Sequence, residues 1–366
     1  MKLECILERL KTILPIIEKV TGKNLALNIL SSILIIGSGK TLKLRATNLD
    51  IGLEVELPAK IEKEGIIAVN GAVLNNLILN TNNEKSVFFE TKNENLIIKT
   101  QNNTSTIKGY SYADFPTIPL ISGDVCFDIN SKKLLSGIKS VFYSASLSDI
   151  KPEISSVYIY PNGEDLFFAA TDSFRLAEKK IKTTHIPDFT GIIIPHKNIN
   201  EIIRVLDLNE GDTKVCFNKN QVSFSYDGVY LTSRLIDGNF PDYKQIIPKE
   251  HKTEVVLLKQ DFIGALKVNG IFLDKFNQID MTIKPETKSF SISTKNGDVG
   301  ETSTNITAVI KGEAVGVSLN YRYLFDVFQS IATDSVSLFL SGNNKPVTIQ
   351  GVSDQTFSYL VMPLNR

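Results

Sequence analysis

Hydrophobic and polar positions repeat the same order of elements three times along the chain. In each third, a strand-like run leads into an amphipathic helix, which we expect over 8–20, 131–144 and 260–272. A second helix follows in each third, over 70–80, 196–206 and 320–331. The pattern predicts three copies of one structural unit. Apolar residues four positions apart mark the inward face of each first helix, namely Leu10 with Leu14, Leu134 with Ile138, and Phe262 with Leu266.

Proline dipeptides divide these copies. Phe115-Pro116, Phe240-Pro241 and Met362-Pro363 recur at intervals of about one third of the chain. Each would end a strand, because proline cannot donate a hydrogen bond to a sheet. Between the helices, alternating runs are separated by Asn-Gly and Asp-Gly turns, which predict antiparallel strands. We therefore expect an α+β fold of three similar domains, 1–120, 121–248 and 249–366, each with two helices packed on antiparallel sheets.

Composition narrows the class of protein. A chain of 366 residues is too long to fold around one ordinary hydrophobic core. The 40 Lys+Arg balance the 40 Asp+Glu, which excludes a uniformly basic surface. Cys5, Cys126 and Cys216 are widely spaced and odd in number, so we expect free thiols in a reducing compartment. No signal-peptide pattern is visible, and apolar runs fall far short of the ~20 residues of a membrane span. These features predict a cytoplasmic protein with no membrane partner.

Basic residues recur on the outward faces of the predicted helices and in the loop after the first one. One interpretation is an ordinary solvated helix face, which acidic neighbours such as Glu18 and Glu201 favour. Recurrence in three equivalent units favours a second interpretation, a surface that contacts nucleic-acid phosphates without reading bases. The candidates for such DNA-facing residues are Lys11, Lys23, Lys132, Lys133, Lys139, Lys197, Arg204, Lys267 and Arg322.

The sequence offers little for catalysis. No histidine pair has metal-ligand spacing, and there is no nucleophile-elbow or phosphate-loop pattern. Gly37-Ser-Gly-Lys-Thr lacks the first glycine of a phosphate loop and is interpreted as a turn. Asp172 and Arg175 could serve as an acid and an anion-binding group, but no base or nucleophile accompanies them. We expect no catalytic residue, no metal and no cofactor.

Four segments together resemble a known family over the full length of the chain. They are Thr47-Asn-Leu-Asp-Ile-Gly-Leu-Glu, Ala170-Thr-Asp-Ser-Phe-Arg-Leu-Ala, Phe240-Pro-Asp-Tyr-Lys-Gln-Ile-Ile-Pro and Val361-Met-Pro-Leu. In this order and spacing they resemble the beta subunit of bacterial DNA polymerase III, the sliding clamp. The resemblance implies a non-enzymatic processivity subunit that forms a ring around duplex DNA as a head-to-tail homodimer. A heterologous interface that closes on itself produces such a ring.

The resemblance also implies partners. These are double-stranded DNA, the DNA polymerase III alpha subunit, an ATP-driven clamp loader, and other polymerases and repair proteins that carry clamp-binding peptides. For the dimer interface, Ile271, Phe272 and Leu273 would face the edge strand around Ile107 of the other subunit. The alternative for that apolar trio is simple core packing.

Polymerases and loaders of the family insert Gln-Leu-x-Leu-Phe-like peptides into an apolar groove between the second and third domains. Taken without the resemblance, most of the corresponding residues would be interpreted as core. Ser173-Phe174 replaces the family's usual Gly-His, so a serine stands where glycine is preferred and the rim becomes more apolar. The positions carried over are Ile154, Thr171, Phe174, Arg175, Leu176, Pro241, Ile246, Leu360, Met362, Pro363 and Leu364.

Three alternatives to the replicative clamp stay open from sequence. The first is a paralogous clamp for repair or drug resistance. The second is an enzyme that acts on a phosphorylated small molecule through Asp172 and Arg175. The third is a repeat protein that binds other proteins and never encircles DNA.

Overall fold

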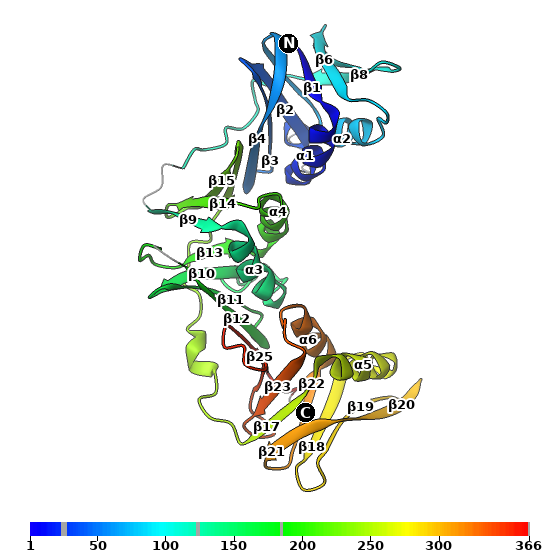
Figure 1. The fold of residues 1–366 in the computed structure, drawn as a ribbon, viewed down its shortest axis with the longest axis vertical. Coiled ribbons are helices and arrows are strands. Elements are labelled where there is room, and N and C mark those ends of the chain that lie inside the picture. The colour runs from blue at the N-terminus through cyan, green and yellow to red at the C-terminus, as the bar shows by residue number, and fades with distance from the viewer. Residues whose placement is uncertain (23–27, 122–124, 184–185, 365–366) are drawn as a thin grey trace. The chain divides into compact units, whose positions relative to one another are not determined.

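The structure is a computed structural model that describes residues 1–22, 28–121, 125–183 and 186–364 (Figure 1). The chain separates into two compact units. The first consists of Met1–Leu135 and Lys197–Asp237, and the second of Ser136–His196 and Gly238–Arg366. The middle third of the chain is thus shared between the units. Consequently, the junction of the first and second repeats lies inside the first unit, and the junction of the second and third repeats lies inside the second.

Two α-helices occur in each third of the described chain, as predicted. They are α1 (Leu7–Val20), α2 (Gly71–Leu79), α3 (Ser131–Val141), α4 (His196–Leu206), α5 (Lys259–Asn269) and α6 (Tyr321–Asp326). Three of them end in the tighter 3₁₀ turns that are common at helix C-termini. These turns, at Phe142–Ser144, Gly270–Phe272 and Val327–Gln329, account for the longer ranges expected from sequence.

In the first unit, twelve strands join in the order β1-β6-β7-β8-β5-β2-β3-β4-β16-β15-β14-β9, and β1 also pairs with β4. All the pairings are antiparallel. The helices α1 and α2 contact each other beside this sheet (Figure 1). The strands are β1 (Lys2–Ile6), β2 (Ser32–Ser38), β3 (Thr41–Thr47), β4 (Ile51–Lys63), β5 (Gly65–Asn70), β6 (Ser86–Lys92), β7 (Asn95–Lys99), β8 (Thr104–Tyr110), β9 (Val125–Asn130), β14 (Asp212–Phe217), β15 (Gln221–Tyr226) and β16 (Val229–Arg234).

The second unit holds a nine-stranded sheet, β13-β10-β11-β12-β25-β24-β23-β17-β21, and a four-stranded sheet, β20-β19-β18-β22. The larger sheet crosses from the middle to the last repeat where β12 pairs with β25. Its strands are β10 (Ser156–Asn162), β11 (Asp165–Thr171), β12 (Arg175–Lys182), β13 (Ile192–Pro195), β17 (Thr253–Leu258), β21 (Ala308–Gly312), β23 (Ser335–Leu340), β24 (Val347–Gly351) and β25 (Phe357–Val361). The smaller sheet contains β18 (Gln278–Lys284), β19 (Ser289–Asn296), β20 (Gly300–Ile306) and β22 (Val315–Asn320).

The predicted inward helix faces are buried. Leu10, Leu14, Ile138, Phe262 and Leu266 are all fully inaccessible to solvent. Residues four apart lie on one side of an α-helix, so each pair contributes a continuous apolar stripe to the core. The α+β fold with three repeated helix pairs is therefore as the sequence pattern predicted.

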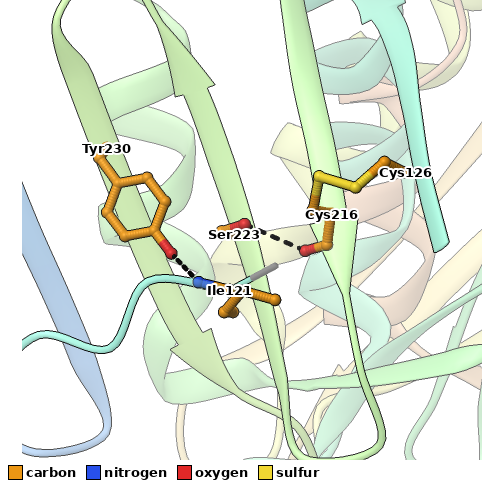
Figure 2. Close-up of a disulfide and its surroundings, with 5 residues drawn as sticks. All are labelled: Ile121, Cys126, Cys216, Ser223 and Tyr230. Atoms are coloured by element: carbon orange, nitrogen blue, oxygen red, sulfur yellow. Dashed lines mark hydrogen bonds between the residues drawn. A yellow bond between two sulfur atoms is a disulfide. The ribbon is translucent and has the colours of Figure 1, made fainter. Parts of the chain in front are cut away.

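The expectation of three free cysteines is wrong for two of them. Cys126 on β9 and Cys216 on β14 form a disulfide, drawn in Figure 2. They are directly opposed partners in the antiparallel ladder, with Cα atoms 4.2 Å apart. Spacing along the chain cannot reveal such a pair, because the two cysteines are 90 residues apart. Cys5 is free and buried, and burial raises the pKa of its thiol to about 12.

Candidate functional site

The candidate groove is built around a tight turn between β11 and β12. Thr171 Oγ1 donates to the Arg175 carbonyl at 2.6 Å and accepts from the Ser173 N–H at 3.1 Å. Asp172 Oδ1 accepts the N–H groups of Phe174 and Arg175 at 3.0 and 2.9 Å. Ser173 has φ +77°, a conformation that favours glycine. This agrees with the glycine that the resemblance places at this position. The turn leaves the Phe174 side chain 60 % exposed.

Arg175 ties this turn to distant parts of the second unit. Its Nε donates to Asp172 Oδ2 at 2.9 Å, one terminal nitrogen donates to Asp326 Oδ2 at 2.6 Å, and the other to the Tyr143 carbonyl at 2.6 Å. The guanidinium also lies over the Tyr323 ring, 4.5 Å from its centroid. Only 11 % of the Arg175 side chain is exposed. The Arg175 side chain therefore links three segments of the second unit.

The charge on Arg175 is secure despite its burial. Burial by itself lowers the pKa of the guanidinium, but Tyr359 and the two carboxylates outweigh that effect, so the pKa is raised. Thr171 is also unavailable to a ligand, since it is 6 % exposed and its hydroxyl hydrogen-bonds within the turn. Both residues are among the positions that the resemblance assigns to the peptide groove. In the structure, their polar atoms already bind the protein itself.

The C-terminal segment closes over the same turn. Arg175 pairs with Val361 in the β12–β25 ladder, and just beyond it the Met362 N–H donates to the Phe174 carbonyl at 2.8 Å. The Leu364 N–H donates to the Ser318 carbonyl, also at 2.8 Å. The end of the described chain is thus held by backbone hydrogen bonds on both sides of Pro363. This brings the predicted residues 171–176 and 360–364 together.

An apolar cluster lies beneath these segments. Leu176 and Leu360 are each 2 % exposed, and Met362 packs against their cluster. Leu176 and Leu360 can form only the floor of a groove, because a ligand could barely reach them. Pro241 and Ile246 are exposed, and the latter is 48 % accessible. The remaining candidates are half-buried and could form its sides, namely Ile154, Met362, Pro363 and Leu364.

Aromatic residues that sequence reasoning missed hold the connector between the second and third repeats. Phe240 stacks on Tyr158 with ring centroids 4.8 Å apart. The hydroxyls of Tyr160 and Tyr243 are 2.7 Å apart, and Tyr243 donates onward to Glu178. Burial raises the pKa of Tyr160 to about 12. The available signal was the alternation of Tyr158 and Tyr160 on one face of a strand.

The basic candidates differ in what they already contact. Lys197 pairs with Asp50 at 2.6 Å, and Arg204 with Glu201 at 2.7 Å. Lys267 and Arg322 are exposed, and within the described residues neither has a recorded ion pair. Lys23 lies outside the described residues. Lys11 and Lys132 lie within 4.0 Å of Glu8 and Glu210, and Lys133 and Lys139 also have partners.

The candidate interface residues separate into exposed and buried positions. Ile271 is 67 % exposed, whereas Phe272 and Leu273 are half-buried. Ile107 is only 6 % exposed, because its side chain points into the core of its own unit. The strand that carries it is nevertheless partly unpaired. β8 pairs with β7 at Thr104–Lys108 and with β5 at Gly109 and Tyr110, so the other edge of Thr104–Lys108 has no partner strand among the described residues.

Among the described residues, no group of histidine, cysteine or carboxylate side chains is arranged to hold a metal ion. In the same part of the chain, no helix has the length and apolar character needed to cross a membrane. Asp172 and Arg175, the pair considered for an enzyme, hydrogen-bond to each other, and Arg175 also binds the Asp326 carboxylate.

Known proteins match the chain along its whole length. Models of the DNA polymerase III beta subunit match residues 1–119 with its N-terminal domain, 128–242 with its central domain and 244–365 with its C-terminal domain. A beta sliding clamp of Synechococcus elongatus is 25 % identical, with 100 % of this chain and 99 % of that protein covered. A beta sliding clamp of Bacillus subtilis is also 25 % identical, with 94 % of each chain covered.

Solved structures agree on the fold. The DNA polymerase III beta subunit from Thermotoga maritima superposes with a TM-score of 0.94 at 22 % identity, covering 100 % of this chain and 99 % of that one. The DNA polymerase sliding clamp from Bacillus subtilis gives the same score at 24 % identity and the same coverage.

Three repeats of paired helices on antiparallel sheets, matched in full by such structures, define a three-domain clamp fold. All three domains also match the models of one family in order. The chain belongs to the family of the DNA polymerase III beta subunit. Its function is that of a DNA sliding clamp, a processivity subunit and not a catalytic enzyme.

Proposed function

We propose that the chain encircles duplex DNA as a head-to-tail homodimeric ring and tethers the polymerase alpha subunit through the groove between its second and third repeats. The observation that carries the docking site is the hydrogen bond from Met362 N–H to the Phe174 carbonyl. It joins the two segments that would flank a bound peptide. Phe174 and Ile246 are exposed and Leu176 and Leu360 are buried, as the rim and the floor of an apolar peptide site would be.

Partner peptides would bind chiefly through apolar side chains and their own backbone. The nitrogens of Arg175 are engaged within the protein, so a peptide carboxylate would have to displace Asp172 or Asp326 to reach them. Phe174 in place of the family's usual histidine adds an apolar rim. This favours peptides with a bulky aliphatic or aromatic residue at that rim. The clamp loader and repair polymerases would use the same groove.

DNA contact would be electrostatic and independent of sequence. Lys267 and Arg322 are exposed on α5 and α6, so they could reach phosphates without losing an ion pair within the described residues. Lys197 and Arg204, which are exposed, would exchange a half-buried carboxylate partner for a phosphate. Surface ion pairs of that kind contribute about 0–1 kcal/mol, so the exchange costs little. Lys11, Lys132, Lys133, Lys139 and Lys23 complete the proposed set.

The dimer would form between the free edge of β8 and an edge strand of the other subunit. β20 is the edge of the four-stranded sheet in the second unit. Pairing two edges satisfies the backbone groups of both strands, and a head-to-tail interface that closes gives a ring. Ile271 is exposed for packing at such an interface, whereas Ile107 would support it from within. The proposed domains remain 1–120, 121–248 and 249–366, and the proposed compartment is the cytoplasm.

A peptide titration tests the docking site. A fluorescent Gln-Leu-Ser-Leu-Phe peptide should bind the full chain saturably, as followed by anisotropy. Ile246→Asp should weaken binding at least tenfold, because it places a charge on the apolar wall. Val73→Asp is the matched control, since Val73 is 50 % exposed on α2. Equal binding by the Ile246→Asp variant and the intact protein would reject the groove.

A second measurement tests encirclement. Once loaded, a ring should stay on closed circular DNA and slide off linear DNA of the same length. Retention should also fall with rising salt where it depends on phosphate contacts. Equal retention on both DNA forms would reject the ring.

A further inference from the structure

The first unit contains a cavity that is related to the proposed groove by the internal repeat. The turn from Thr47 to Ile51 repeats the turn from Thr171 to Arg175. Thr47 Oγ1 donates to the Ile51 carbonyl at 2.8 Å and accepts the Leu49 N–H at 3.0 Å. Asn48 Oδ1 accepts the next two N–H groups, each at 3.0 Å. Leu49 has φ +78°, matching +77° at Ser173.

The closing strand is repeated as well. Arg234, at the end of β16, donates its N–H to the Asp50 carbonyl at 2.8 Å. Met362, just past β25, makes the corresponding bond to Phe174 at the same length. A backbone frame that flanks the candidate groove at one junction is therefore present at the other.

The connector between the first and second repeats covers this frame and leaves a cavity of about 240 Å³. The cavity is lined by Leu49, Ile51 and Ile118, together with the flanking prolines Pro116 and Pro119. Its volume is close to that of one or two bulky side chains. Tyr230 holds the connector in place, since its hydroxyl donates to the Pro119 carbonyl at 3.0 Å. The same hydroxyl accepts the Ile121 N–H at 2.8 Å (Figure 2).

The backbone conformation and exposure of Leu49 also indicate a binding site at this cavity. A bulky side chain rarely adopts a positive φ, and its backbone there is strained by about 1 kcal/mol or more. Leu49 gains little burial in return, because 47 % of its surface is exposed. A strained, exposed leucine at the mouth of an apolar cavity is a feature that stability alone does not explain. Strain of this kind is typical of binding sites.

The charges beside the cavity indicate what would bind. Asp50 is neutralised by Lys197 at 2.6 Å. Arg234 lines the cavity, is exposed, and has no recorded acidic partner among the described residues. Arg234 and Gln221 also line an adjoining polar cavity of about 470 Å³, which Asn218 and Asn220 complete. Because the two cavities share Arg234 and Gln221, an apolar compartment adjoins one that offers amides and a guanidinium.

We propose that these adjoining cavities are a second docking site, which binds a short extended peptide whose bulky apolar side chain is followed by a carboxylate. The apolar side chain enters beside Leu49 and Ile118, and the carboxylate meets Arg234. The inference rests on the proposed groove, of which this site is the repeat-related counterpart. With both sites occupied, one partner could hold a single subunit at two points, or two partners could bind at once.

Isoleucine methyl NMR of the full chain separates the two sites in one spectrum. Ile51 and Ile118 report on the new site, and Ile154 and Ile246 on the groove. The probe is acetyl-Ser-Leu-Phe-Asp-Asp-amide, and acetyl-Gln-Leu-Ser-Leu-Phe-amide is the comparison peptide. The acidic probe should shift the Ile51 and Ile118 methyls saturably. That response should persist when the comparison peptide saturates the groove.

Two variants test the assignment. Arg234→Gln should weaken the acidic probe at least fivefold, whereas Lys219→Gln should change its affinity less than twofold. Lys219 is a suitable control because it is an exposed cation on the neighbouring loop and lines neither cavity. Leu49→Gly should also weaken binding, and it relieves the positive φ, so loss of fold cannot explain the result.

Each outcome is decisive. A response confined to Ile154 and Ile246 would overturn the second site and leave the proposed groove standing. A response confined to Ile51 and Ile118 would do the reverse. Equal weakening by Arg234→Gln and Lys219→Gln would reduce the effect to nonspecific charge, which also overturns the second site.

Discussion

The two junction turns, 47–51 and 171–175, share a backbone and differ in the side chain that closes them. Both use a threonine and an Asx side chain to bind the same N–H groups, and both have a positive φ at the third position. The fifth residue is Ile51 in one and Arg175 in the other. Ile51 is 2 % exposed in an apolar setting, whereas Arg175 makes three hydrogen bonds across its unit.

This difference shows that the two repeats share the backbone conformation of the turn, whereas the side chain at its fifth position determines the local interactions. The apolar closure at 51 leaves a small cavity under a connector. The ionic closure at 175 ties three segments of the second unit together. The connectors also differ in how they are held. The Tyr230 hydroxyl bonds to the first connector, whereas Tyr160, Tyr243 and Glu178 form a hydrogen-bonded chain at the second.

The largest expected effect concerns the disulfide, a covalent tie found in the first unit. Reduction, or Cys126→Ser, should destabilise that unit by about 2–4 kcal/mol, because the bond closes a long loop. Hydrogen exchange should report faster opening of β9 and β14 on adding dithiothreitol, with β12 and β25 unchanged. Cys5 is buried and free, so it provides no competing disulfide. Unchanged exchange of β9 and β14 would contradict this view.

Arg175→Ala should have the next largest effect, on the second unit. It leaves Asp172, Asp326 and the Tyr143 carbonyl without their shared donor, which should cost about 2–3 kcal/mol. Urea unfolding measures the loss. Arg204→Ala is the control, because the Arg204 side chain is 47 % exposed and its single ion pair with Glu201 should contribute less than about 1 kcal/mol. Similar losses of stability in the two variants would mean that the Arg175 network does not link the segments of the second unit.

Local periodicity was enough to predict the repeated helices and the α+β class. The Leu10–Leu14 and Phe262–Leu266 pairs lie on single helices, so the sequence itself contains the spacing that burial requires. The positive φ at Ser173 could also be anticipated, since glycine is the residue that the resemblance places there.

What escaped prediction depends on contacts between distant segments. Asp326 lies 151 positions from Arg175, and Cys216 lies 90 from Cys126. Strand register and sheet order decide which of these side chains meet, and neither is encoded in spacing. For the same reason, Ile107 was placed on an edge strand but not recognised as pointing inward.

The connectors offer a smaller test of the comparison. Tyr243→Phe removes the hydroxyl between Tyr160 and Glu178, which should cost about 1–2 kcal/mol and weaken Gln-Leu-Ser-Leu-Phe binding. Tyr230→Phe breaks the corresponding tie at the first junction and should cost about 1 kcal/mol, with no effect on that peptide. Thermal unfolding and anisotropy measure both. If Tyr230→Phe weakens the peptide equally, the two junctions do not act separately.

The smallest effect should come from glycine at the two positions of positive φ. Ser173→Gly relieves backbone strain at an exposed side chain, so it should stabilise the protein by about 0.5–1 kcal/mol. Leu49→Gly relieves the same strain but also removes apolar contact, so its net gain should be smaller. Urea midpoints of the two variants, measured side by side, provide the test. A larger gain at 49 than at 173 would mean that Leu49 contributes no packing, and would leave peptide binding as the reason for a leucine there.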